Sequence, residues 1–517
     1  MSGLVTVSKK LVIINSASSL ATRLLSITVL IWVQQYLLKN ISVEEYSLLP
    51  VIYSLIIFLP VLTVIVTGGI KRFILVAFAE NREERITQIV SSMFPVLCLL
   101  GVCVFLFGGL LAWKIDAVLR IDPEYLNEAR LMLMLIMLLE AVRLPTQALN
   151  GGLFVKQRFV LLNLISVAAE CFRLVLLFVL LFGVSVSVVS VVVATVVAGL
   201  VEVFVLVFVS RRLLPSQRFV PSAFDWSIVR ELTGFGGWSS LYGFSGMIRK
   251  AADPLILNRF STPLEVTCFH LGALIPNRLE TIVNGSFLNS VAPVVVGLHV
   301  DRQDQRLKGL YLRLGRYAMW GLLLVIAPFL VHYQQIVTLY VGATYLSAGT
   351  VLFLLLACYP IVYGNILQTV LANAKVRMRS LALREAISAG VNLLLTLVLV
   401  GHYQMGAVGS ATATFIVYGL GSILLFWPFG KGMVEATWSE VWRDILWPGI
   451  TPFFVAFAVM KVLAWHYPVI SWATIAVNAM LGATAYVLVM WLVAKDVDKS
   501  QVKEVLHKLR AHRALRS

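Results

Sequence analysis

The chain has 517 residues, of which 59% are hydrophobic and 13% charged. Soluble proteins carry roughly 25% charged residues, so this composition excludes an ordinary soluble domain. The formal net charge is +16, and the 5 cysteines all fall in apolar stretches, which indicates neither a disulfide framework nor a metal site.

Apolar stretches of about 18 or more residues, each long enough to cross a membrane as a helix, recur from Leu11 almost to Trp491. The alternating strands of a membrane barrel do not appear, so helices are expected to satisfy the backbone in lipid. The first stretch has no small-residue cleavage site, which predicts a membrane helix rather than a signal peptide. We predict an all-α integral membrane protein with about fourteen transmembrane helices. They are expected near 11–37, 47–69, 87–111, 127–149, 159–183, 187–210, 233–257, 264–293, 317–336, 346–371, 383–402, 405–428, 446–465 and 470–494.

The distribution of basic residues predicts the orientation. With the N-terminus in the cytoplasm, most of the 42 Lys and Arg residues fall in cytoplasmic segments, such as 302–316 and 375–384. Those in external loops are Lys39, Lys114, Arg120, Arg130 and Arg259. The positive-inside rule therefore favours cytoplasmic N- and C-termini in a bacterial inner membrane. Anionic phospholipids, and not nucleic acid, are the expected partners of this basic charge.

Two parts of the chain resemble each other. Lys156-Gln-Arg158, between the predicted fourth and fifth helices, corresponds to Lys375-Val-Arg377, between the tenth and eleventh. This pattern favours two pseudo-symmetric six-helix lobes, a design typical of secondary transporters, although Leu- and Val-rich helices also look alike by chance. The expected parts are an N-terminal lobe (1–210), a cytoplasmic linker (211–232), a C-terminal lobe (233–430), helices 13 and 14 (431–495) and a basic cytoplasmic tail (496–517). The tail is interpreted as an amphipathic helix on the membrane surface, with a disordered basic segment as the alternative.

Three arginines are predicted near mid-bilayer. Arg23 lies about 18 Å into the first helix at 1.5 Å per residue, and Arg249 and Arg278 lie at comparable depth in the seventh and eighth helices. A charge there costs about 2.5–3.5 kcal/mol on insertion scales, so each is expected to face a cavity or a partner. Guanidinium groups bind phosphate and carboxylate in a bidentate way, which predicts an anionic substrate. The other candidate cavity residues are Lys250, Asn15, Tyr242, Asn277 and Asn284.

Acidic residues inside the predicted helices have two interpretations. Arg249 precedes Asp253 by one helical turn, so it pairs either with that carboxylate or with a substrate. Glu140/Arg143 and Glu170/Arg173 are spaced three residues apart, which favours ion pairs within a helix. Glu202 and Glu280 are lone acids, and their protonation offers a way to couple transport to an ion gradient. The candidates for ion pairing or ion coupling are Asp253, Glu140, Arg143, Glu170, Arg173, Glu202 and Glu280.

Several motifs, in chain order, are similar to those of one family. They are Arg23-Leu-Leu-Ser followed by Ile41-Ser-Val-Glu-Glu-Tyr46, Gly68-Gly-Ile-Lys-Arg72 followed by Ala79-Glu-Asn-Arg-Glu-Glu-Arg85, Phe224-Asp-Trp-Ser-Ile-Val-Arg-Glu-Leu232, Asp253-Pro-Leu-Ile-Leu-Asn-Arg-Phe260 and Gly406-Ala-Val-Gly-Ser-Ala-Thr-Ala-Thr414. Together they resemble the Wzx-type polysaccharide flippases of the MOP (MATE-like) superfamily. Ser47 and Asn258 stand where that family usually has glycine, which bears on loop geometry.

The resemblance implies two six-helix bundles around a cavity. It implies transport of undecaprenyl-pyrophosphate-linked oligosaccharide to the periplasmic leaflet by alternating access, for O-antigen, capsule or exopolysaccharide biosynthesis. On this hypothesis Arg23, Arg249 and Arg278 attract the diphosphate, with Lys250 assisting. Helices 13 and 14 are expected to form a groove for the polyprenyl tail. A polysaccharide polymerase and a chain-length regulator are further expected partners.

Two other classes of protein remain as alternatives. A multidrug cation antiporter of the same fold is expected to have a cavity dominated by acids and aromatics, whereas the midplane residues here are mainly basic. A membrane polymerase needs a large external loop with acid and base residues, and the external loops here are short, so no enzyme activity and no catalytic residue is expected. The chain has no P-loop, which argues against ATP drive. Neither a cofactor nor a metal ion is predicted.

Overall fold

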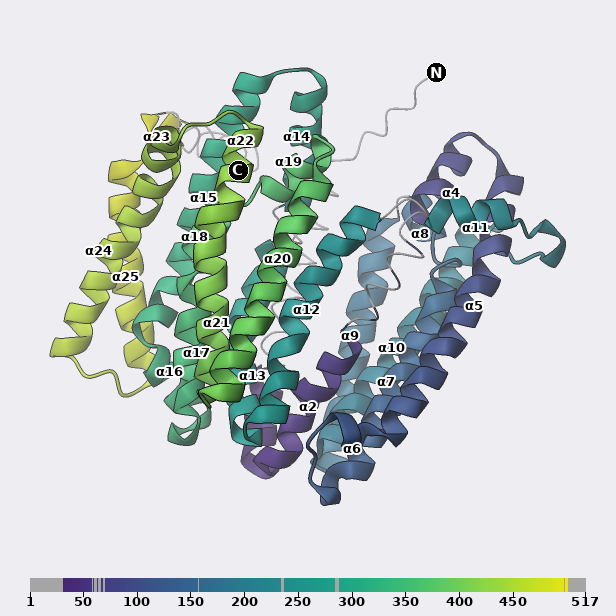
Figure 1. Ribbon diagram of the computed structural model, residues 1–517, viewed down its shortest axis with the longest axis horizontal. Helices are drawn as coiled ribbons and strands as arrows, with labels where there is room; N and C mark the ends of the chain where they lie inside the picture. Colours follow the sequence, from purple (N-terminus) through teal and green to yellow (C-terminus); the bar gives the residue numbers. More distant parts are fainter. Residues whose placement is uncertain are drawn as a thin grey trace, which may run out of the picture. The chain divides into compact units, whose positions relative to one another are not determined.

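The computed structural model describes residues 31–57, 59, 63, 67, 70–156, 158–233, 237–283, 288–496 and 498–500. All regular elements in these ranges are helices (Figure 1). The chain divides into two compact units, unit 1 (Met1–Thr267) and unit 2 (Cys268–Ser517).

Within the described ranges, nine helices are long and apolar enough to cross a membrane. They are Glu83–Trp113, Val160–Gly183, Val188–Leu213, Asp304–Val331, Ala343–Tyr363, Met378–His402, Gly406–Met433, Trp438–His466 and Trp472–Val493. The predicted all-α membrane fold is thereby confirmed. The predicted helix at 11–37 lies mostly outside the described residues, and that at 47–69 lies partly outside them.

Three further predicted spans are present as helices that carry several charges. They are α7 (Leu126–Thr146), α12 (Gly237–Phe260) and α13 (Pro263–Ile282). Each has transmembrane length, and the charged side chains in it lower its hydropathy. Charge inside a membrane helix marks a functional or paired site, so these three helices are the ones to search for a substrate cavity.

Unit 1 is a bundle around α10, which packs against α7 and α9 (Figure 1). Besides α7 and α12, its α-helices include α2 (Val43–Ile56), α4 (Ile70–Ala79), α5 (Glu83–Trp113), α6 (Ile115–Val118), α8 (Gly152–Val155), α9 (Phe159–Gly183), α10 (Val188–Leu213) and α11 (Trp226–Thr233), and residues 31–40 are also helical. Although α10 is rich in valine, a poor helix former in water, lipid leaves the backbone no partner outside the helix. Ser187 caps this helix by accepting a hydrogen bond from the Ser190 backbone N–H at 3.3 Å.

The backbones of α5 and α7 approach each other closely at Gly101. A Cβ atom at this position would lie 2.5 Å from the backbone oxygen of Ala141 and 3.6 Å from Cδ of Pro145. Small residues at such crossings let two membrane helices pack backbone to backbone.

We therefore expect Gly101→Ala to lower the free energy of unfolding by about 1–3 kcal/mol, because the backbone of α7 must shift. Gly109→Ala in the same helix is the matched control, since its nearest neighbour is the flexible Met134 side chain at 3.8 Å. Alanine is also the better helix former, so the control is expected to be neutral or stabilising. Unfolding of the purified protein in detergent measures both effects, and equal losses in the two variants would contradict this packing.

The segment after α10 is folded onto the end of unit 1. Gln217 is fully buried; its Nε2 donates to the Ala148 oxygen at 2.8 Å, and its Oε1 accepts from the Gly152 backbone N–H at 3.0 Å. Ser91 and Ser92 of α5 accept hydrogen bonds from the backbone N–H groups of the same segment, at residues 220 and 225. The predicted linker at 211–232 is therefore docked on unit 1.

Asp225 begins the last part of this segment. It caps α11 by accepting a hydrogen bond from the Ser227 backbone N–H at 2.8 Å. The hydrogen bonds from the Ser227 side chain and backbone hold the pKa of this carboxyl below its usual value. The cap is thus made by the ionised side chain, which also suits the positive end of the helix dipole.

Unit 2 contains the rest of α13 and the C-terminal helices. Its other α-helices in the described residues are α14 (Asn289–Val300), α15 (Asp304–Val331), α16 (Tyr333–Val341), α17 (Leu346–Ala357), α18 (Tyr359–Tyr363), α19 (Gln368–Ala374), α20 (Met378–Thr396), α21 (Gly406–Gly421), α22 (Trp427–Met433), α23 (Trp438–Val441), α24 (Trp447–His466) and α25 (Trp472–Val493). π-helical turns extend α20 at Leu397–His402, join α21 to α22 at Ser422–Phe426 and join α23 to α24 at Trp442–Leu446. α24 packs along α25, and both contact α15.

Two predicted spans of unit 2 differ from the structure. α15 begins at Asp304 instead of 317, because Leu307, Tyr311 and Leu312 bury one face of a segment whose other face is charged. The span predicted at 346–371 is broken between α18 and α19. Residues 284–287 of the span predicted at 264–293 lie outside the described residues.

The break after α18 is held by a buried amide. Asn365 is 1% exposed; its Oδ1 accepts from the Tyr311 hydroxyl and its Nδ2 donates to the Phe426 backbone oxygen, both at 2.8 Å. A broken membrane helix needs side-chain partners of this kind, because lipid offers none to the interrupted backbone.

Candidate functional site

The packed face of α13 is fixed by close contacts within unit 2. A Cβ atom at Gly272 would lie 2.6 Å from the Ala348 backbone oxygen, so α13 and α17 touch there. One turn further on, the Tyr359 hydroxyl donates to the Pro276 backbone oxygen at 2.7 Å. At 100° per residue, Gly272 and Pro276 lie on one side of the helix.

The opposite side of α13 carries polar and charged groups. Asn277, Arg278 and Thr281 all have exposed side chains in unit 2. A guanidinium exposed to lipid would cost about 2.5–3.5 kcal/mol near mid-bilayer, so this side is expected to face a water-filled space. An arginine beside an amide and a hydroxyl is a suitable surface for an anion that also carries sugar hydroxyls.

α12 carries the candidate residues of unit 1. Arg249, Lys250 and Tyr242 are half-buried, and Asp253 is 4% exposed. The end of this helix is anchored by Asn258, whose Oδ1 accepts from the Arg120 backbone N–H at 2.9 Å and whose Nδ2 donates to the Arg120 backbone oxygen at 3.0 Å. An amide at this position therefore makes two hydrogen bonds that the glycine usual in the resembled family cannot make.

The candidate residues are thus divided between the two units. Arg249 and Lys250 belong to unit 1 and Arg278 to unit 2. Asn15, Arg23 and Asn284 lie outside the described residues. That the arginines share one site therefore stays a prediction.

Both predicted i,i+3 ion pairs are present in unit 1. Arg143 NH1 lies 2.8 Å from Oε1 of Glu140 in α7. Arg173 binds both carboxylate oxygens of Glu170 in α9, with Nε to Oε2 at 2.9 Å and NH2 to Oε1 at 2.6 Å. Such pairs lower the cost of placing charge inside a membrane protein.

Glu202, near the middle of α10, has a different kind of partner. Its Oε1 accepts a hydrogen bond from the Ser166 hydroxyl of α9 at 2.8 Å. Among the described residues it forms no ion pair, unlike Glu140 and Glu170. Glu280 is half-buried in α13 of unit 2.

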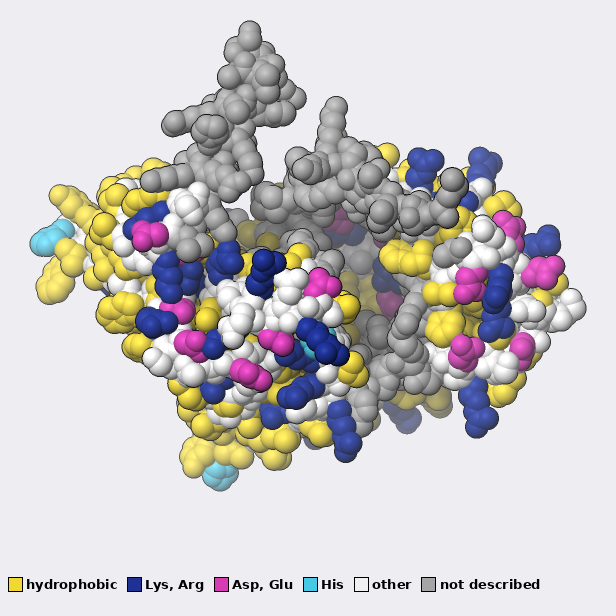
Figure 2. Space-filling model, turned by 90° about the horizontal axis from the view of Figure 1, so that it is seen from above, with side chains coloured by type: hydrophobic (Ala, Val, Ile, Leu, Met, Phe, Trp, Pro, Cys, Tyr) yellow, Lys and Arg dark blue, Asp and Glu magenta, His cyan; other side chains and the backbone are white. Residues whose placement is uncertain are grey.

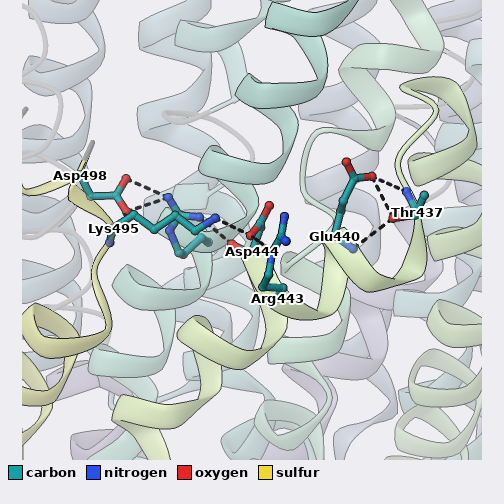
Figure 3. A network of polar contacts seen from close by, with 7 residues as sticks. Thr437, Glu440, Arg443, Asp444, Lys495 and Asp498 are labelled. Atoms are coloured by element: carbon teal, nitrogen blue, oxygen red, sulfur yellow. Dashed lines mark hydrogen bonds and ion pairs between the residues drawn. The ribbon is translucent and has the colours of Figure 1, made fainter.

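Sequence reasoning missed a buried charge network in unit 2. Arg316 and Asp498 have side chains only 5% and 4% exposed, and Arg316 NH2 lies 2.8 and 2.7 Å from the two carboxylate oxygens. Asp498 also accepts from the Tyr317 hydroxyl at 2.6 Å, and Arg316 NH1 donates to the Asp444 backbone oxygen at 2.6 Å. Figure 3 shows the neighbouring contacts of Asp444, Lys495 and Asp498. The network joins the middle of α15 to the segments that precede α24 and follow α25.

The same end of the molecule is rich in basic side chains. Figure 2 shows Lys and Arg side chains gathered on the face where α14, α22 and α23 end in Figure 1. In unit 2 they include Lys308, paired with Glu440 at 2.7 Å, and the exposed Arg377 and Arg443. This gathering of cations is the arrangement expected of a cytoplasmic membrane surface.

Among known sequences, the chain has relatives in polysaccharide biosynthesis. Residues 8–299 match a family described as "Polysaccharide biosynthesis protein". The chain is also 21% identical over 516 residues to the "Uncharacterized membrane protein EpsK" of Bacillus subtilis (strain 168), with 95% of this chain and 96% of EpsK covered.

Solved structures with a similar fold are membrane transporters. "Lipid II flippase MurJ, inward closed conformation" has a TM-score of 0.67 at 12% identity, covering 94% of this chain and 99% of MurJ. An inward-facing multidrug resistance MATE family transporter of the MOP superfamily has a TM-score of 0.62 at 14% identity, covering 78% of this chain and 93% of its own. A MOP superfamily transporter from Pyrococcus furiosus has a TM-score of 0.59 at 14% identity, covering 81% of this chain and 94% of its own. At these identities the likeness shows the fold, which is that of MurJ and the MATE transporters.

Proposed function

We propose that this chain, which belongs to the polysaccharide biosynthesis protein family, is a flippase for undecaprenyl-pyrophosphate-linked oligosaccharide. In this proposal it moves repeat units from the cytoplasmic to the periplasmic leaflet of a bacterial inner membrane, with both of its own termini in the cytoplasm. The observation that carries the proposal is the exposed Arg278 on the side of α13 opposite the contacts of Gly272 and Pro276. The fold it shares with a lipid II flippase supports the same class of substrate.

The substrate has a charged and a neutral polar part, and the candidate residues suit both. Arg278 offers bidentate hydrogen bonds to the diphosphate, while Asn277 and Thr281 beside it suit sugar hydroxyls. Arg249, Lys250 and Tyr242 offer the same chemistry from α12, and Arg23, Asn15 and Asn284 are proposed to complete the cavity. Alternating access then consists of the lobes at 1–210 and 233–430 opening to one side of the membrane at a time.

Asp253 bears on how many of these charges reach the substrate. It lies one turn from Arg249 and is 4% exposed. If the two pair, the net charge that α12 offers falls to that of Lys250, and Arg278 becomes the principal anion-binding residue. This is why Arg278, and not Arg249, is the first residue to substitute.

The hairpin of α24 and α25 is proposed to hold the polyprenyl chain. Its outward face carries large apolar side chains that are more than half exposed, among them Phe454, Val462 and Met480. A polyprenyl chain loses apolar burial in a wet cavity, so it is expected to stay against such a surface while the head group crosses.

Glu202 is proposed as a proton-binding residue that couples transport to an ion gradient. Its partner is the Ser166 hydroxyl, which can donate to a carboxylate or accept from a carboxylic acid. Glu140 and Glu170 are held in ion pairs with arginines of their own helices, whereas the hydrogen-bond partner of Glu202 is a neutral hydroxyl.

We expect Glu202→Gln to lower gradient-driven transport by about tenfold or more, within the usual range of coupling free energies. Glutamine keeps the hydrogen bond to Ser166 and cannot release a proton, so the pH dependence is expected to flatten while exchange without a gradient persists. Glu124→Gln in an exposed external segment is the control. A Glu202→Gln variant with a wild-type pH profile would exclude this residue from coupling.

The test of the function is genetic and chemical. Deletion of the gene is expected to accumulate lipid-linked repeat units on the cytoplasmic leaflet and to abolish surface polysaccharide. The later steps, which are expected to require a polymerase and a chain-length regulator, would then lack their substrate. Restoration of drug efflux, instead of polysaccharide export, by the reintroduced chain would favour the alternative, a multidrug cation antiporter.

A further inference from the structure

Three tryptophans form an exposed stripe where α23 passes into α24. Trp438, Trp442 and Trp447 are 45%, 58% and 59% exposed. The first two are four residues apart, and a π-helical turn at Trp442–Leu446 adds a residue before the third. A π-helical turn needs about one more residue than an α-helical turn, so all three rings stay on one side. Tryptophans at one end of a membrane helix mark the level of the lipid headgroups.

Two cations share one carboxylate oxygen beside this stripe. Arg443 Nε lies 3.1 Å from Oδ1 of Asp444, and Lys495 Nζ contacts the same oxygen (Figure 3). The Asp444 side chain is 10% exposed, whereas those of Arg443 and Lys495 are 71% and 43% exposed. The group therefore presents a net positive charge to its surroundings. Arg443 uses Nε for Asp444, and its two terminal nitrogens carry four further N–H donors.

The buried network behind these residues holds both cations in place. Arg316 NH1 donates to the Asp444 backbone oxygen at 2.6 Å, which fixes the segment that carries Arg443. Asp498, held by Arg316, accepts from the Lys495 backbone N–H at 3.2 Å, which fixes the segment that carries Lys495. The spacing of the two cations is thus set by the fold, although the side chains themselves are exposed.

We propose that Arg443 and Lys495 bind the phosphate of an anionic glycerophospholipid, whose glycerol and upper acyl chains lie on the tryptophan stripe. A guanidinium and an ammonium brought to one oxygen lie at a separation that a single phosphate group spans, and charge-assisted bonds to phosphate are among the stronger hydrogen bonds. Lys431, 5.1 Å above the Trp438 ring, adds positive charge next to the stripe. The site lies wholly in unit 2 and does not depend on which substrate is transported.

Lipid binding to the purified full-length protein tests this site. Titration with phosphatidylglycerol, followed by native mass spectrometry, gives the dissociation constant. Arg443→Gln with Lys495→Gln is expected to weaken binding roughly tenfold, the loss of one charge-assisted hydrogen bond or more. The matched control is Arg302→Gln with Arg377→Gln, which removes the same charge from exposed positions of unit 2. Equal affinities in the two double variants would overturn the proposal.

A second variant and two further probes identify the ligand. Trp442→Ala leaves the ion pairs intact and is expected to weaken phosphatidylglycerol binding without changing the unfolding temperature in lipid-free detergent. Inorganic phosphate that binds as tightly as phosphatidylglycerol would overturn the role of the stripe. Farnesyl diphosphate that binds through Arg443 and Lys495 while phosphatidylglycerol does not would overturn the phospholipid assignment in favour of an isoprenoid diphosphate.

Discussion

Arg316→Ala is expected to lower the free energy of unfolding by about 3–5 kcal/mol, because it leaves the Asp498 carboxylate buried without its countercharge. Both side chains are at most 5% exposed, so the carboxylate that remains in the variant is removed from water. The Arg316 guanidinium also lies 5.5 Å from the Trp320 ring, a contact that alanine removes.

Unfolding of the purified protein in detergent measures this loss. Arg443→Ala is the matched control, since it removes an arginine from the same network at a position where the side chain is 71% exposed, and only a small change is expected. The double variant Arg316→Met/Asp498→Leu is expected to regain much of the stability, because an apolar pair leaves no buried charge. A wild-type transition in Arg316→Ala would show that the pair does not hold the hairpin.

Arg278→Ala is expected to reduce transport by roughly ten- to hundredfold, the effect of losing charge-assisted hydrogen bonds of about 1.5–3 kcal/mol to the diphosphate. The side chain lies opposite the contacts at Gly272 and Pro276 that pack α13, so the substitution is expected to spare the fold. Arg278→Lys keeps the charge and loses the bidentate geometry, and an intermediate rate is expected.

Arg259→Ala is the control for this experiment, because it removes an exposed arginine from the end of α12, away from the predicted midplane. Polymer export in cells, normalised to the amount of protein in the membrane, compares the variants. Wild-type export by Arg278→Ala would exclude Arg278 from the substrate site.

The membrane fold was predictable from sequence because it depends on local properties. Hydropathy and length locate spans such as Val188–Leu213 whatever they pack against. The pairs Glu140/Arg143 and Glu170/Arg173 were equally accessible, since a spacing of three residues brings side chains together on any helix.

Contacts between distant parts of the chain were not predictable in this way. Arg316 and Asp498 are 182 residues apart, and in the sequence Arg316 is one of several basic residues in the predicted cytoplasmic segment 302–316. The break after α18 depends on hydrogen bonds from Asn365 to Tyr311 of α15 and to the backbone next to α22, and no local sequence pattern predicts these contacts. Of the candidate site, sequence predicted which helices carry charge, and the structure shows which side of α13 is packed and which carries Arg278.

Transport by the purified protein tests the central claim most directly. The protein is reconstituted into liposomes that contain undecaprenyl-pyrophosphate-linked oligosaccharide in both leaflets, and a membrane-impermeant glycosidase is added outside. We expect liposomes with the wild-type protein to lose the glycan of both leaflets, whereas protein-free liposomes and those with Arg278→Ala lose only the outer-leaflet fraction at early times. Retention of the inner-leaflet glycan by wild-type liposomes would contradict the proposed flippase activity.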